Sequence, residues 1–197
     1  MYKLKLVILF IVFLISVKAQ KLFPKEVVWA TTHPIAALKL KKIYTKVFLI
    51  YKEPSVILAL DNFNNGGKLD AFRHVFFMAA FAQKIKLKKL RKLGIAHEKG
   101  NYKQFLKHQN EEGELPDSLS GVMDLMNNEL GFKIGLNNKK INLEELKLVV
   151  IKEINNGNAV IVKRNYNKLY VDCNNVVIDI KAYEKKWHVP KCLISSK

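Results

Sequence analysis

The chain has 197 residues, of which 49% are hydrophobic, so it is long enough for one domain with a packed core, or for one domain with a small appendage. Its formal net charge of +17 is compatible with nucleic acid, an anionic membrane or an acidic polymer as a partner. The lysines are scattered and no arginine-rich cluster with interleaved aromatic residues occurs, which argues against nucleic acid and leaves general solubility or an anionic envelope component.

Residues 1–19 are predicted to be a signal peptide. A short basic segment at residues 1–5 precedes an apolar run, and small residues lie near the end of that run. The run is too short for a comfortable transmembrane span, so we expect cleavage before Gln20, with an uncleaved anchor as the alternative. The protein is therefore expected to be secreted or to lie in the periplasm or envelope.

Residues 20–165 are predicted to form a helical domain, because apolar residues recur at helical spacing along most of this stretch. A short first helix stops near His33, and Pro34 can begin the next helix, which has a lysine-rich outer face. Residues 51–60 are ambiguous between a connector and another short helix. Helices are predicted over residues 23–30, 35–47, 69–84, 85–93, 119–135 and 142–154.

The last of these helices has the clearest boundaries. Asn142 is predicted to cap it, Glu145 stands where a capping box needs an acid, and Gly157 follows its end. For the helix before it, Ser118 or Ser120 is the candidate cap.

The C-terminal part of the chain changes to a β pattern. Apolar segments at residues 159–163 and 169–172 flank a turn-rich stretch and predict a β-hairpin, and residues 176–180 could add a third strand. We assign residues 166–197 to the hairpin end and the C-terminal tail. The predicted fold class is therefore mainly α, a helical body with a small C-terminal β-hairpin appendage.

Cys173 and Cys192 are the cysteines of the chain. In an exported protein, two thiols suggest one disulfide, which here would tie the C-terminal tail to a strand. The spacing alone leaves the pairing open, because a disulfide depends on geometry.

Three apolar segments contain polar side chains at helix-compatible spacing. Asp70 and His74 are four residues apart and share a helical face, with Arg73 beside them. In another segment, Asp124 lies three and four residues before two asparagines. Buried polar groups need partners, so we expect the three segments to meet. The candidate site residues are Asp70, Arg73, His74, His97, Glu98, Asp124, Asn127 and Asn128.

Such a cluster supports two interpretations. Imidazoles and carboxylates together can hold a divalent metal that activates water, with His74, His97 and Asp124 as the candidate ligands. In this hydrolase hypothesis, with or without a metal, Glu98 is the acid/base and Arg73 is an anion clamp. The alternative is a non-enzymatic envelope or interaction protein whose polar cluster fixes the packing of three helices. The sequence names no substrate.

Three short motifs, taken in order, resemble the signatures of an uncharacterised bacterial family of secreted or phage-linked proteins, a domain of unknown function. They are D-A-x-R-H at residues 70–74, H-E at residues 97–98 and M-D-x-x-N-N-x-x-G at residues 123–131. The resemblance covers roughly residues 26–165, implies a mostly helical fold and marks the same polar residues. It implies no activity. The leader also resembles those of Bacteroidetes secreted proteins.

Overall fold

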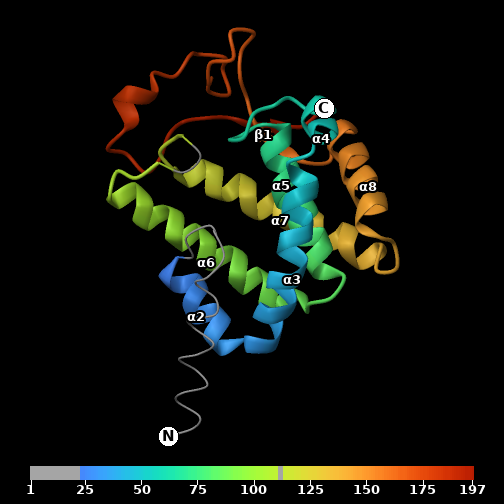
Figure 1. Cartoon of the computed structure of the whole chain (residues 1–197). Coiled ribbons are helices and arrows are strands. Elements are labelled where there is room, and N and C mark those ends of the chain that lie inside the picture. The colour runs from blue at the N-terminus through green and yellow to red at the C-terminus, as the bar shows by residue number, and fades with distance from the viewer. Residues whose placement is uncertain (1–22, 111–112) are drawn as a thin grey trace, which may run out of the picture.

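The computed structural model describes residues 23–110 and 113–197. Its described part consists mainly of α-helices, as the fold class predicts, with a small antiparallel pair of strands near the C-terminus (Figure 1). The predicted signal peptide at residues 1–19 lies outside the described residues. The elements are α2 (Pro24–Thr32), α3 (Pro34–Tyr51), α4 (Pro54–Leu58), α5 (Lys68–Ala82), α6 (Leu87–Leu106), α7 (Ser118–Asn137), α8 (Leu143–Asn155), β1 (Val160–Val162), the 3-10 helix η1 (Ile180–Tyr183) and β2 (Leu193–Ser195).

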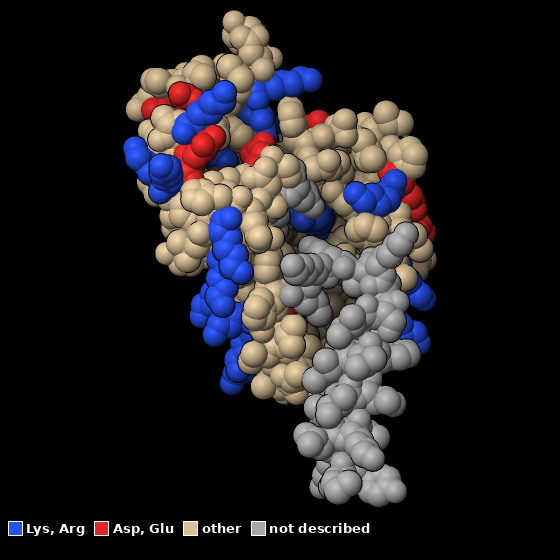
Figure 2. Space-filling view, turned by 60° about the vertical axis from the view of Figure 1, so that its left-hand side comes forward, with Lys and Arg blue, Asp and Glu red and all other residues tan. Residues whose placement is uncertain are grey.

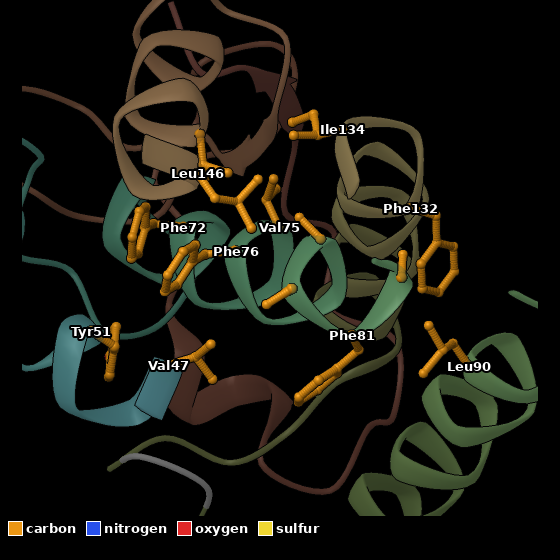
Figure 3. Packing of buried hydrophobic residues seen from close by; sticks show 14 of the residues in the cluster. Val47, Tyr51, Phe72, Val75, Phe76, Phe81, Leu90, Phe132, Ile134 and Leu146 are labelled. Carbon is orange, nitrogen blue, oxygen red and sulfur yellow. The ribbon is translucent and has the colours of Figure 1, made fainter. Parts of the chain in front are cut away.

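Helix α5 is the centre of the molecule. Phe72, Val75 and Phe76 are fully buried on it, and buried side chains of α3, α6, α7 and α8 surround this helix (Figure 3). Full burial of one such side chain stabilises the fold by about 1.5–3 kcal/mol. The polar residues of α5 are therefore held by a helix that packs on nearly every side.

Helices α5 and α7 approach each other closely because α7 presents glycines to α5. A Cβ atom added at Gly135 would lie 2.2 Å from the carbonyl oxygen of Ala79, and one at Gly131 would lie 2.5 Å from that of Val75. These glycines follow Asp124 and Asn128 at helical spacing, so the same face of α7 carries both pairs. The close crossing thus brings Asp124 and Asn128 against α5.

Local capping sets where the helices begin. Asn142 and Glu145 form the predicted capping box of α8. For α7, neither predicted serine is the cap: the carboxylate of Asp117 accepts hydrogen bonds from the backbone N–H groups of Leu119 and Ser120. A carboxylate carries a full negative charge at the helix N-terminus, which makes it a strong cap.

The strand partner of β1 differs from the one that the sequence suggests. β1 pairs in antiparallel register with β2, so that Ile161 lies opposite Ile194. The segment at residues 169–172 contributes only isolated bridges, between Arg164 and Tyr170 and between Val171 and Val177. The expected third strand at residues 176–180 is likewise reduced to a single bridge at Val177.

The chain between β1 and β2 extends away from the helical body at the top of Figure 1. A disulfide joins Cys173 in this segment to Cys192 at its end, and Cys192 directly precedes β2. The pairing suggested by the cysteine count is therefore confirmed.

None of the helices in the described ranges combines the length and hydropathy that a membrane crossing requires.

Candidate functional site

Asp70 is fixed at the start of α5 by the loop before it. Its Oδ2 accepts a hydrogen bond of 2.8 Å from the backbone N–H of Gly66, and its Oδ1 lies 2.6 Å from Nη2 of Arg73. Gly66 has a φ of 69°, and a Cβ there would lie 3.1 Å from the side chain of Val162, so glycine suits this position. The loop thus connects the carboxylate of Asp70 to strand β1.

His74 lies between α5 and α7, with both ring nitrogens engaged. Its Nδ1 is 3.3 Å from Oδ1 of Asn128. Its Nε2 is 3.2 Å from Oδ1 of Asp124 and 3.6 Å from Oδ1 of Asp70. An amide oxygen only accepts, so the tautomer with a proton on Nδ1 satisfies this contact, and Nε2 is directed at the two carboxylates.

The cluster is buried and its formal charges do not cancel. Asp70, Asp124 and His74 keep only 3%, 6% and 8% of their surfaces exposed. Two carboxylates and the guanidinium of Arg73 sum to one negative charge. Burial of net charge is costly, so either a proton on His74 or a bound cation would stabilise the cluster.

The geometry suits a cation. Among the described residues, Asp70, His74 and Asp124 each offer a ligand atom, and these atoms all lie within 4.8 Å of one another. One imidazole with two carboxylates is a donor set used for first-row divalent metals. The guanidinium of Arg73 lies 3.2 Å from Nε2 of His74, so it would have to swing aside to admit the ion.

A small cavity of about 20 Å³ lies beside the cluster, and Asp70, Arg73 and Asp124 line it. This volume is enough for a single water molecule. Asn101 of α6 lines the same cavity and is 4% exposed, and its Oδ1 accepts no hydrogen bond from the described residues. A buried amide oxygen without a donor is costly, so a water or ligand in this cavity would satisfy it.

A second cavity, of about 370 Å³, adjoins the first, because Pro116 and Asp117 line both. On its wall, Nζ of Lys191 lies 2.7 Å from Oδ2 of Asp117. Tyr170 donates a hydrogen bond of 2.7 Å to Glu114, another lining residue. Burial raises the pKa of Tyr170 well above its ordinary value, which keeps the phenol a donor. The larger cavity has room for part of a small substrate.

Of the three candidate ligands, His74 and Asp124 belong to the group that could hold a metal among the described residues, and His97 does not. The imidazole of His97 lies instead against α2, with Nδ1 3.0 Å from Oε1 of Glu26. Neighbouring residues on a helix point about 100° apart, so His97 and Glu98 cannot both face the same partner. The structure directs His97 to α2 and Glu98 to α7.

The carboxylate of Glu98 lies against α7 at Gly121, where an added Cβ would be 2.8 Å from Oε2. Oε2 also accepts a hydrogen bond of 3.2 Å from the amide of Asn101. Gly121 and Asn101 both line the small cavity. Glu98 is thus adjacent to the walls of this cavity, although it is not one of the three metal-ligating residues.

Asn127 has a different role from its neighbour Asn128. Its side chain accepts a hydrogen bond from the N–H of Val160 and donates one to the C=O of the same residue, each 2.9 Å long. Asn127 therefore fixes strand β1 to α7, and neither of these two hydrogen bonds involves His74. Of the predicted residues, the structure brings together Asp70, Arg73, His74, Asp124 and Asn128.

Sequence reasoning missed Asn101 and Asp117. Asn101 lies three residues after Glu98, so the spacing that linked Asp124 to its asparagines also connects this pair. Asp117 follows a proline and precedes an apolar run, which is the position of an N-cap.

Comparison with known proteins gives a family but no activity. Neither the curated proteins nor the solved structures yielded a match. A family model matches residues 27–158, which include every residue of the cluster and end just before β1. The chain therefore belongs to the family described as Domain of unknown function (DUF6973).

Proposed function

We propose that the protein is an exported hydrolase in which one divalent metal ion is held by Asp70, His74 and Asp124. The observation that carries this proposal is the convergence of three ligand atoms within 4.8 Å beside a water-sized cavity. Export is supported by the basic and apolar pattern of residues 1–19.

The other residues have complementary roles in this proposal. The metal would polarise a carbonyl or phosphoryl group of a substrate seated in the larger cavity and would make a water in the small cavity more acidic. Glu98 would take a proton from the attacking water through a bridging water that Asn101 orients, and would return it to the leaving group as the bond breaks. Arg73, displaced from Asp70 by the metal, would stabilise the negative charge that develops.

One observation favours a second candidate, a non-enzymatic envelope or interaction protein. Nη2 of Arg73 lies 2.6 Å from Asp70 and 3.2 Å from His74, which is close to where a cation would bind. A guanidinium in this place already offsets part of the carboxylate charge. In this case the cluster only stabilises the crossing of α5 and α7.

Metal-dependent hydrolysis separates the two candidates. The chain is stripped with a chelator and assayed with Mn²⁺, Zn²⁺ or Mg²⁺ on p-nitrophenyl acetate, p-nitrophenyl phosphate and its diester. Turnover that returns with metal and is lost in Asp124→Asn and Glu98→Gln supports the hydrolase. Glu129→Gln is the control, because Glu129 lies on the same helix but pairs at the surface with Arg91. Absence of metal uptake together with absence of turnover would favour the structural role.

A further inference from the structure

Helix α3 has an exposed face of mixed character. Ile35, Leu38 and Leu49 keep 71%, 47% and 67% of their surfaces exposed. Lys39, Lys42 and Lys46 are also exposed, and all six positions follow helical spacing along one side of the helix. The opposite side carries the buried residues Ala36, Ala37, Val47, Ile50 and Tyr51. The exposed face runs from residue 35 to 49, a length of about 20 Å.

The charge on this face has one sign. Helix α3 contains no Asp or Glu. Of the acidic residues next to it in sequence, Glu26 pairs with His97 and Glu53 pairs with Lys147. On the face shown in Figure 2, lysine and arginine side chains extend over the whole height, whereas acidic side chains lie mainly in the upper half. An isologous contact between two copies of this face would bring lysines against lysines, which opposes self-association.

We infer that the exposed face of α3 docks the protein on an anionic lipid surface. Lysines attract the headgroups, and their long stems allow the ammonium groups to remain at the interface while apolar neighbours enter it. Ile35, Leu38 and Leu49 would insert at the boundary between headgroups and acyl chains. A soluble polyanion would engage the lysines but offer nothing to these apolar side chains. This inference does not depend on the proposed hydrolase activity.

The test measures binding of the full chain to vesicles of phosphatidylglycerol and phosphatidylcholine, compared with phosphatidylcholine alone. An uncleaved leader would bind both kinds by apolar contact, so the informative quantity is the preference for anionic vesicles and its decrease with salt.

The variant Lys39→Gln/Lys42→Gln/Lys46→Gln should bind anionic vesicles on the order of 100-fold more weakly, since each lysine near such a surface contributes about 1 kcal/mol. The matched control, Lys133→Gln/Lys139→Gln/Lys140→Gln, removes three exposed lysines elsewhere and should bind almost as the wild type does.

A second pair of variants tests the apolar residues. Ile35→Ser/Leu49→Ser should weaken binding to anionic vesicles, whereas Leu58→Ser/Leu148→Ser, at residues that are 85% and 63% exposed, should not. Equal losses in both lysine variants would show that only total charge matters and would overturn the inference. It would also be overturned if no preference for anionic vesicles is found, or if sedimentation shows that the α3 variants dissociate a dimer without changing vesicle binding.

Discussion

Nε2 of His74 lies 3.2 Å from Oδ1 of Asp124, and this contact joins helix α5 to helix α7 at the crossing where glycines of α7 meet the backbone of α5. Both groups are buried, so their interaction is little screened by solvent. The contact therefore affects both the stability of the crossing and any chemistry of the cluster.

Replacing Asp124 should destabilise the protein. Asp124→Asn keeps the shape of the side chain but removes the charge that faces His74, and we expect the free energy of unfolding to fall by about 1–3 kcal/mol. Urea unfolding of the metal-free protein measures it. The surface variant Glu129→Gln, which breaks only the exposed pair with Arg91, should change it by less than about 1 kcal/mol. Equal effects of the two variants would contradict the buried interaction.

Gly135→Ala should disrupt the crossing itself. The new Cβ would lie 2.2 Å from the carbonyl oxygen of Ala79, which is backbone and cannot turn aside. We expect a loss of about 1–3 kcal/mol or more, of the size seen when cores are overpacked. Thermal unfolding measures it, with the neighbouring exposed position as a control, since Leu136→Ala should cost much less. A stable Gly135→Ala protein would mean that the helices do not approach so closely.

Asn127→Ala should lower the free energy of unfolding without changing the metal affinity. It removes both hydrogen bonds to Val160 and leaves partly buried backbone groups of β1 without these partners, at a cost of about 1–3 kcal/mol. Metal affinity should change little, because Asn127 does not contribute to the ligand group. Calorimetric titration beside unfolding experiments tests both parts, and Asn137→Ala, at an exposed position, is the control.

Removing the disulfide should destabilise the C-terminal region. Cys173 and Cys192 are separated by 19 residues, and closure of a loop of this size stabilises a protein by about 3 kcal/mol in the chain-entropy treatment. The double variant Cys173→Ser/Cys192→Ser should show this loss in unfolding experiments without reductant. A reductant should lower the stability of the wild type to the same level and leave the variant unchanged.

Acid should weaken the contact between Lys147 and Glu53. The hydrogen bond from Lys147 holds the pKa of Glu53 below its ordinary value. A carboxyl group with a lowered pKa in the folded state contributes stability above its unfolded pKa, and this contribution is lost as the pH falls through the folded pKa. Because Glu53 is partly exposed, the effect should stay under about 1 kcal/mol. Glu53→Gln should therefore be less stable than wild type at neutral pH and equal to it in acid.

The sequence predicts much of the helical body and part of the candidate site. α8 could be foreseen with its cap and its end, because Asn142, Glu145 and Gly157 are local signals. The meeting of Asp70 and His74 with Asp124 could be foreseen because buried polar groups need one another. His97 could not be placed, because its partner Glu26 is 71 residues away and belongs to a helix without a polar pattern of its own. The partner of β1 could not be chosen either, since residues 169–172 and 193–195 are both short apolar segments. Only contacts between parts of the chain that are distant in sequence decide which of the two segments pairs with β1.

The most direct test of the metal site is electron paramagnetic resonance of Mn²⁺ added to the chelator-treated protein. The proposal predicts one bound Mn²⁺ per chain, with a ¹⁴N coupling from an imidazole that disappears in His74→Gln, and with binding lost in Asp124→Asn. It would be contradicted if Mn²⁺ stays free in solution, or if the bound signal is the same in the wild type and in Asp124→Asn.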